Sequence, residues 1–159
     1  MQPIIYDVAV SIDGFICGPG GDISRFAQEG PVIADYSARL EGYATAIMGR
    51  ATYEFGYRFG MEPGQNPYPH MRTIVVSKSL DLPESAEVDL QPACDLALIE
   101  AMRSLSPGPI YLCGPGSQRT LVNRSGARLG RQGRLGDAGA GHGLPHPRTS
   151  WLAPVPQRQ

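Results

Sequence analysis

The amino-acid composition of the chain changes sharply near residue 122, and this change confines a folded core to the part before it. Residues 1–120 carry fourteen acidic and eight basic side chains, whereas residues 121–159 carry one acid, Asp137, and six arginines. From residue 123 onward there are seven glycines and four prolines, with no isoleucine, phenylalanine, tyrosine or lysine. Such a segment buries too little apolar surface to offset the entropy cost of ordering it. We therefore predict a domain over residues 1–122 and a Gly/Arg/Pro-rich tail over residues 123–159 without helix or strand.

Two interpretations of the tail stay open. Thirteen arginines against one lysine indicate a GC-rich gene, and reading such DNA in a shifted frame produces runs of glycine, arginine, alanine and proline. The tail is then either the product of a frameshift near residues 122–125 or a disordered extension. A nucleic-acid-binding tail is not expected, because lysines and interleaved aromatic residues are missing from it.

Apolar patterns before residue 122 predict strands that alternate with helices. Strands are expected at residues 4–12, 44–48, 73–76 and 109–113, where β-branched or apolar residues run together. Helices are expected at residues 32–43, at 50–55, and after Asp95, which is a suitable N-cap. This order predicts an α/β fold with a mostly parallel sheet and flanking helices.

Three of the predicted strands end in segments suited to phosphate: residues 48–53, 76–79 and 113–117. The carboxyl ends of parallel strands share one edge of a sheet, where ligands bind. Arg50 and Lys78 would place positive charge there, as a 2′-phosphate requires. Taken singly, each is more often a solvated surface base. Together they favour NADPH over NADH.

Cysteine usage and hydropathy indicate a cytoplasmic protein. Cys17, Cys94 and Cys113 are odd in number and lack CxxC spacing, so reduced thiols and no metal site are expected. No stretch approaches the roughly 20 apolar residues that a membrane span needs, and no basic leader precedes the first apolar run.

Four motifs, in order, carry a resemblance to a known family: VSIDGFI at residues 10–16, IMGRATYE at 47–54, VVSK at 75–78 and IYLCGPG at 110–116. They resemble the dihydrofolate reductase superfamily, and most closely its branch with the C-terminal reductase domain of the bacterial bifunctional deaminase-reductase of riboflavin biosynthesis and related small reductases. The resemblance implies a three-layer dihydrofolate-reductase-like fold with a mostly parallel central sheet. The tail departs from the family pattern, so the C-terminal strands of that fold are expected to be missing.

The resemblance also implies a set of cofactor contacts. Ala9 and Ile16 would touch the nicotinamide amide, and the loop over residues 14–26 would close over the ring as a lid. The phosphates would be held by residues at the three strand ends, namely Gly49, Arg50, Thr52, Ser77, Lys78, Gly114, Pro115, Gly116, Ser117 and Gln118. The family has Gly-Gly where this chain has Gly114-Pro115, and proline removes one N–H donor there.

Two carboxylates are candidates for catalysis, Asp13 and Asp35. Each has an alternative role that is not catalytic. Asp13-Gly14 is also typical of a turn, and Asp35 is typical of an exposed carboxylate near a helix N-terminus. Met61 and Tyr68 are candidates for the wall of a substrate cleft. The lid of true dihydrofolate reductases contains a tryptophan that this chain lacks, which argues against a folate substrate.

The function that the resemblance implies is NADPH-dependent hydride transfer to a small heterocycle, pyrimidine- or pteridine-like, of the kind performed by 5-amino-6-(5-phosphoribosylamino)uracil reductase. The partner would be a small-molecule substrate rather than nucleic acid or membrane, and a homodimer stays open. The alternative is a truncated, inactive product that at most binds nucleotide or self-associates through an open sheet edge.

Overall fold

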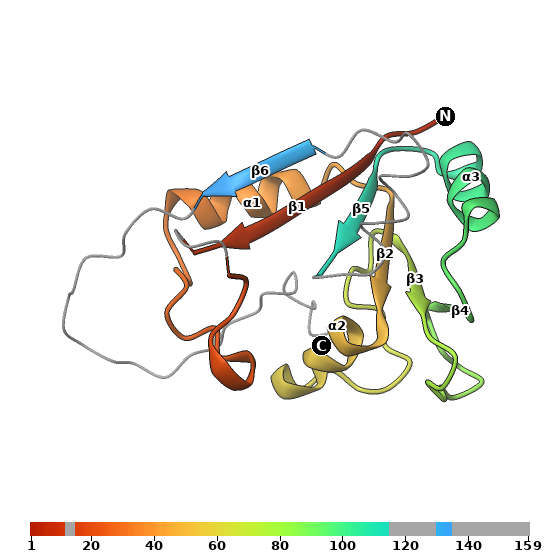
Figure 1. Ribbon diagram of the computed structural model, residues 1–159, viewed down its shortest axis with the longest axis horizontal. Helices are drawn as coiled ribbons and strands as arrows, with labels where there is room; N and C mark the ends of the chain where they lie inside the picture. Colours follow the sequence, from red (N-terminus) through yellow and green to blue (C-terminus); the bar gives the residue numbers. More distant parts are fainter. Residues whose placement is uncertain (12–14, 115–129, 135–159) are drawn as a thin grey trace, which may run out of the picture.

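The computed structural model describes residues 1–11, 15–114 and 130–134, and these form one twisted sheet with helices on both faces (Figure 1). The sheet has six strands in the order β4-β3-β2-β5-β1-β6. The strands are β1 (Ile4–Val10), β2 (Thr45–Gly49), β3 (Arg72–Val76), β4 (Asp89–Gln91), β5 (Ile110–Cys113) and β6 (Gly130–Arg134). Each neighbouring pair is parallel, so the predicted α/β class with a parallel sheet is confirmed.

The helices begin close to where the sequence predicts them. They are α1 (Pro31–Leu40), α2 (Arg50–Phe55) and α3 (Leu96–Leu105), with short 3-10 turns η1 (Pro19–Gly21) and η2 (Gly56–Phe59). Pro31 occupies the first turn of α1, where its missing N–H costs nothing. Asp95 caps α3 as predicted, because its side chain accepts a hydrogen bond of 2.8 Å from the backbone N–H of Leu98.

The alternation of side chains along the central strands divides the core into two layers. On β2, Ala46 and Met48 face a cluster with Leu40 of α1 and Tyr53 of α2. Ile47, between them, faces the opposite cluster with Ile99 and Met102 of α3. On β5, Tyr111 belongs to the first cluster, and its neighbours Ile110 and Leu112 belong to the second. The fold therefore has three layers, with α1 and α2 on one face of the sheet and α3 on the other.

Strand β6 corrects one expectation. The sequence predicts no strand after residue 122, yet residues 130–134 pair in parallel with β1, with Ile5 opposite Gly130 and Tyr6 opposite Arg131. The pairing uses backbone donors and acceptors, which every residue except proline offers. The side chains of this segment are glycine, arginine and glutamine, and they show no alternation of apolar and polar residues that would predict a strand. The division at residue 122 stays a prediction, because most of residues 123–159 lie outside the described part.

Candidate active site

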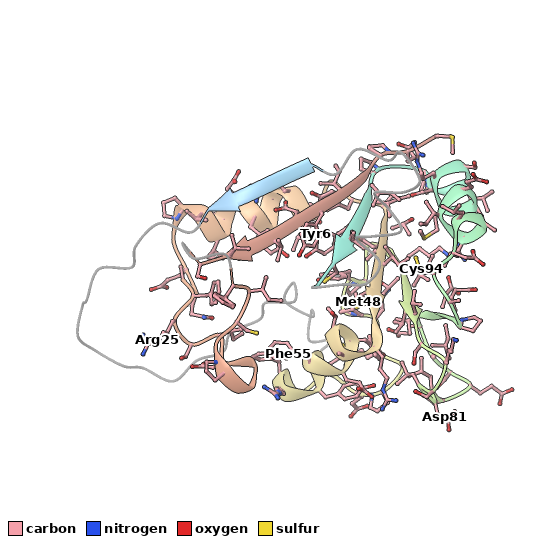
Figure 2. The ribbon with its side chains drawn as sticks, in the orientation of Figure 1. Tyr6, Arg25, Met48, Phe55, Asp81 and Cys94 are labelled. Atoms are coloured by element: carbon pink, nitrogen blue, oxygen red, sulfur yellow. The ribbon has the colours of Figure 1, made fainter. Side chains whose placement is uncertain are left out.

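A cavity of about 260 Å³ opens between the first strand, the loop after it, and the start of α2. None of the lining side chains in the described part of the chain carries a charge. Strand β1 contributes Val8 and Ala9, the loop contributes Ile16, Cys17, Gly21, Ile23 and Phe26, the helices contribute Tyr36, Ala51, Thr52 and Phe55, and the end of β5 contributes Tyr111, Cys113 and Gly114. Figure 2 shows Phe55 on the side of α2 that faces this loop. A largely apolar hollow with a few polar groups is the usual form of a small-molecule site.

Four residues that the sequence predicts as cofactor contacts line this one cavity: Ala9, Ile16, Thr52 and Gly114. They come from three segments that lie far apart in the sequence, at residues 9–16, 52 and 114. The register of the sheet explains the convergence, because Met48 on β2 lies opposite Cys113 on β5. The segments that follow these strands, Gly49-Arg50 and Gly114, therefore leave the sheet at the same level.

The closest approach in the site is between Gly114 and Thr52. Gly114 has φ +88°, a conformation that side-chain-bearing residues rarely adopt. A Cβ atom at this position would lie 2.8 Å from Cγ2 of Thr52 and nearer still to its Oγ1. Only glycine therefore lets the end of β5 pass this close to the first turn of α2. The Thr52 side chain therefore packs directly on the backbone of Gly114, and two of the predicted phosphate-binding segments lie in contact.

The predicted phosphate-binding bases lie at the same edge of the sheet but do not line the cavity. Gly49 is the N-cap of α2 and pairs with Val76 at the end of β3. Arg50 is exposed, and its guanidinium donates to Glu54 Oε1 and Ser79 Oγ, each at 2.8 Å. Lys78 is exposed on the turn after β3.

The turn that carries Lys78 is stabilised by the side chain of Ser77, the residue before Lys78. Ser77 Oγ accepts hydrogen bonds from the backbone N–H groups of Ser79, at 3.2 Å, and Leu80, at 3.0 Å. The turn therefore positions Lys78 and Ser79 beside Arg50, which bonds to Ser79. Arg50, which also pairs with Glu54, and Lys78 lie near this end of β3, and their role in binding phosphate stays a prediction.

Of the two candidate carboxylates, the structure describes Asp35, and it does not bring this side chain into the cavity. Asp35 is exposed on α1 and pairs with Arg39, and it is not among the lining residues. Asp13, Pro115, Gly116, Ser117 and Gln118 lie outside the described residues, so their predicted roles stay predictions. Met61 and Tyr68, expected in the cleft wall, are instead buried in the core cluster under α2.

Sequence reasoning missed a pair of tyrosines in the cavity, Tyr36 of α1 and Tyr111 of β5. Their hydroxyl oxygens lie 2.7 Å apart, within hydrogen-bond distance. Burial is the main cause that raises the pKa of each hydroxyl well above the ordinary phenol value, so both remain protonated at neutral pH. Tyr36 lies on the predicted apolar face of its helix, but spacing along one helix does not reveal that this face meets the end of a distant strand.

Aromatic packing fixes Tyr111 beneath the cavity. Its ring stacks on Tyr43 at a centroid distance of 5.3 Å and meets Tyr68 edge-on at 5.7 Å. Tyr68 in turn lies 3.5 Å from the thiol of Cys113, whose pKa is raised by burial. Offset and edge-to-face ring pairs of this kind each add about 0.5–1.5 kcal/mol beyond area burial. The floor of the cavity is thus a rigid aromatic cluster.

A buried ion pair ties α1 to β1 beside this floor. Asp7, 1% exposed, accepts from Arg39 Nε at 2.7 Å and from the hydroxyl of Tyr43 at 3.3 Å. Arg39 also holds Asp35, and its guanidinium lies 5.9 Å from the Tyr36 ring centroid. Since Asp7 and Arg39 neutralise one another, neither adds a net charge next to the cavity.

The loop after β1 forms a wall of the cavity and is attached to η2. Arg58 donates to the carbonyl of Gly20 at 3.2 Å, and its guanidinium lies 5.2 Å from the centroid of the Phe55 ring. A Cβ on Gly21 would lie 3.6 Å from Phe55, which shows how closely the loop packs on α2. The predicted lid segment therefore contacts the predicted site.

Two other kinds of site find no support in the described residues. No group of three or more histidine, cysteine or acidic side chains is placed to hold a metal ion there. Within the same residues, no helix is both long and apolar enough to cross a membrane. The three cysteines are free thiols.

Comparison with known proteins supports the fold. No family model matches the chain, and no curated protein matches it. A solved structure does match: a "putative riboflavin biosynthesis protein" from Shewanella sp. PV-4, with a TM-score of 0.62 and 19% sequence identity. The match covers 84% of this chain and 78% of the other. At this identity the likeness concerns the fold, which is α/β and consistent with the dihydrofolate-reductase-like architecture that the motifs predict.

Proposed function

We propose that this protein is an NADPH-dependent reductase that transfers a hydride to a small heterocyclic, pyrimidine- or pteridine-like substrate. The observation that carries the proposal is the convergence of Ala9, Ile16, Thr52 and Gly114 in one largely apolar cavity. The match to a structure named for riboflavin biosynthesis supports a role of this kind, with 5-amino-6-(5-phosphoribosylamino)uracil as one candidate substrate.

The residues present fit a nicotinamide dinucleotide. The cavity offers apolar walls for a ring, and Thr52 and Gly114, from two of the predicted phosphate-binding segments, lie in contact in its lining. When bound, the cofactor would supply the hydride. Ala9 and Ile16 would orient its ring, while Thr52 and the backbone of Gly114 would hold its phosphates.

The preference for a 2′-phosphate would come from the exposed bases at the end of β3. Arg50 bonds to Ser79 and Glu54, and Lys78 lies on the same turn. The guanidinium presents a planar fork and the ammonium a point charge, and each interacts with phosphate more strongly than with a ribose hydroxyl. Removal of either base should therefore weaken NADPH binding more than NADH binding.

The test is a thermal melt of the 159-residue chain with excess NADPH, with NADH as comparator. A ligand that binds only the folded state adds about 2.7 kcal/mol of stability at a hundredfold excess over its Kd. We expect NADPH to raise the Tm more than NADH does. The variants Arg50→Ala and Lys78→Ala should lose that difference. Arg72→Ala, which removes an exposed base at the opposite end of β3, should keep it. A cooperative melt that neither nucleotide shifts would refute the cofactor assignment.

A further inference from the structure

Among residues 1–11, 15–114 and 130–134, no charged side chain lines the cavity, and this restricts what these residues can bind. A charged group that leaves water without a partner loses several kcal/mol of hydration free energy. Asp7, which is buried next to lining residue Val8, is already paired with the partly exposed Arg39 at 2.7 Å. Arg58 is committed to the carbonyl of Gly20 and to the face of Phe55. A ligand that carries a carboxylate or ammonium into the cavity would therefore find no counter-charge among the lining residues.

The pair of tyrosine hydroxyls offers a hydrogen bond to an uncharged ligand in the cavity. Tyr36 and Tyr111 together hold two hydroxyl hydrogens, and the 2.7 Å contact between them uses one. When Tyr111 donates to Tyr36, the hydrogen of Tyr36 is left to point into the cavity that its side chain lines. Because burial raises the pKa of both groups, this donor stays protonated over the whole physiological pH range.

The packing around the pair fixes its position. Tyr111 is 3% exposed and is held between Tyr43 and Tyr68, so it cannot follow a ligand. Tyr36 reaches it from α1, which the Asp7–Arg39 ion pair attaches to β1. A donor held in this way binds an acceptor atom at one place and so selects among rings by where their acceptor lies.

Building on the proposed function, we propose that the substrate is an uncharged, planar heterocycle with a carbonyl or imine acceptor, and that this acceptor takes a hydrogen bond from the hydroxyl of Tyr36. Tyr36 then selects and orients the ring, in place of the carboxylate that the sequence leads one to look for on α1. The apolar side chains Ile23, Phe26 and Phe55 cover the faces of the ring. Any charged substituent of the substrate stays outside the cavity.

The test measures ligand binding by calorimetry, in the presence of NADP⁺, for three proteins: the wild type, Tyr36→Phe and Tyr57→Phe. Tyr57 is a matched control because it is half-buried, packs against Tyr53 and does not line the cavity. The probes are lumazine, a two-ring heterocycle that is uncharged at pH 6, and pterin-6-carboxylate, a similar ring that carries a carboxylate. Binding of NADPH alone is measured in parallel for each protein.

We expect the wild type to bind lumazine at least about tenfold more tightly than the carboxylate. Loss of one net hydrogen bond, about 1–1.5 kcal/mol, should weaken lumazine binding to Tyr36→Phe about 5- to 15-fold, with Tyr57→Phe unchanged. NADPH affinity should be equal in all three proteins. The inference is overturned if lumazine does not bind, if the carboxylate binds as well, or if Tyr36→Phe binds lumazine like the wild type. If lumazine binds as expected while NADPH does not, the cofactor assignment alone fails.

Discussion

Two of the aspartate–arginine pairs in the described part of the chain have nearly the same N–O distance and very different burial, and they allow a direct measurement of what burial does. In the first, Arg39 Nε lies 2.7 Å from Asp7 Oδ2, and the two side chains are 24% and 1% exposed. In the second, Arg72 Nε lies 2.6 Å from Asp89 Oδ2, and the side chains are 58% and 45% exposed. We predict that the two pairs differ severalfold in their contribution to the free energy of unfolding.

The magnitude follows from what each substitution leaves behind. Removing one partner of a buried ion pair costs about 3–5 kcal/mol, because an unpaired charge stays buried. Arg39 is partly exposed and keeps Asp35, which lowers the expected loss for Asp7→Ala to about 2–4 kcal/mol. Tyr43 also loses the acceptor of its hydroxyl. By contrast, Asp89→Ala should cost less than about 1 kcal/mol, the usual limit for an exposed pair.

The assay is urea unfolding followed by circular dichroism, arranged as a double-mutant cycle for each pair. The cycle cancels the local effect of each alanine and isolates the coupling energy between the partners. We expect a coupling of at least about 1.5 kcal/mol for Asp7 with Arg39, unchanged in 1 M salt. The coupling of Asp89 with Arg72 should be below about 0.5 kcal/mol and vanish in 1 M salt. At that salt concentration the Debye length is about 3 Å, and exposed charges are strongly screened. Equal couplings for the two pairs, or a buried coupling that salt abolishes, would refute the reasoning.

Three further predictions concern single positions. Gly114→Ala should lower stability by about 2 kcal/mol or more and abolish NADPH stabilisation, because its Cβ would meet Thr52; Gly20→Ala, at φ +67° with open space around it, should cost only about 1 kcal/mol and keep the nucleotide effect in the same melts. Asp95→Ala should cost about 1 kcal/mol in urea unfolding through loss of the α3 cap, and an unchanged midpoint would contradict the capping role. Since burial raises the pKa of Cys113, its thiolate fraction at pH 8 is below that of free cysteine. Iodoacetamide should therefore label Cys113 more slowly than free cysteine, at a rate that rises with pH above 8. Labelling as fast as that of free cysteine, measured by mass spectrometry, would contradict this.

Local signals in the sequence determine much of the fold. Runs of β-branched or apolar residues locate β2, β3 and β5, Asp95 predicts the start of α3, and a glycine ends β2 and follows β5. These signals depend on a few neighbouring residues, so they can be recognised without knowledge of the rest of the chain. The short strand β4 and the strand β6 escaped prediction because backbone pairing with β3 and β1 forms them, and no side-chain pattern reports such pairing.

For the site, the sequence determines which residue types stand at the strand ends, and only the tertiary structure decides which of them share a cavity. Ala9, Thr52 and Gly114 meet because parallel pairing aligns the ends of their strands and because Gly114 lacks the Cβ that would strike Thr52. Asp35, a candidate from its place on α1, turns to Arg39 and solvent, whereas Tyr36, the next residue, turns to Tyr111. One step along a helix rotates a side chain by about 100°, and only packing of the helix against the sheet selects which side faces the cavity.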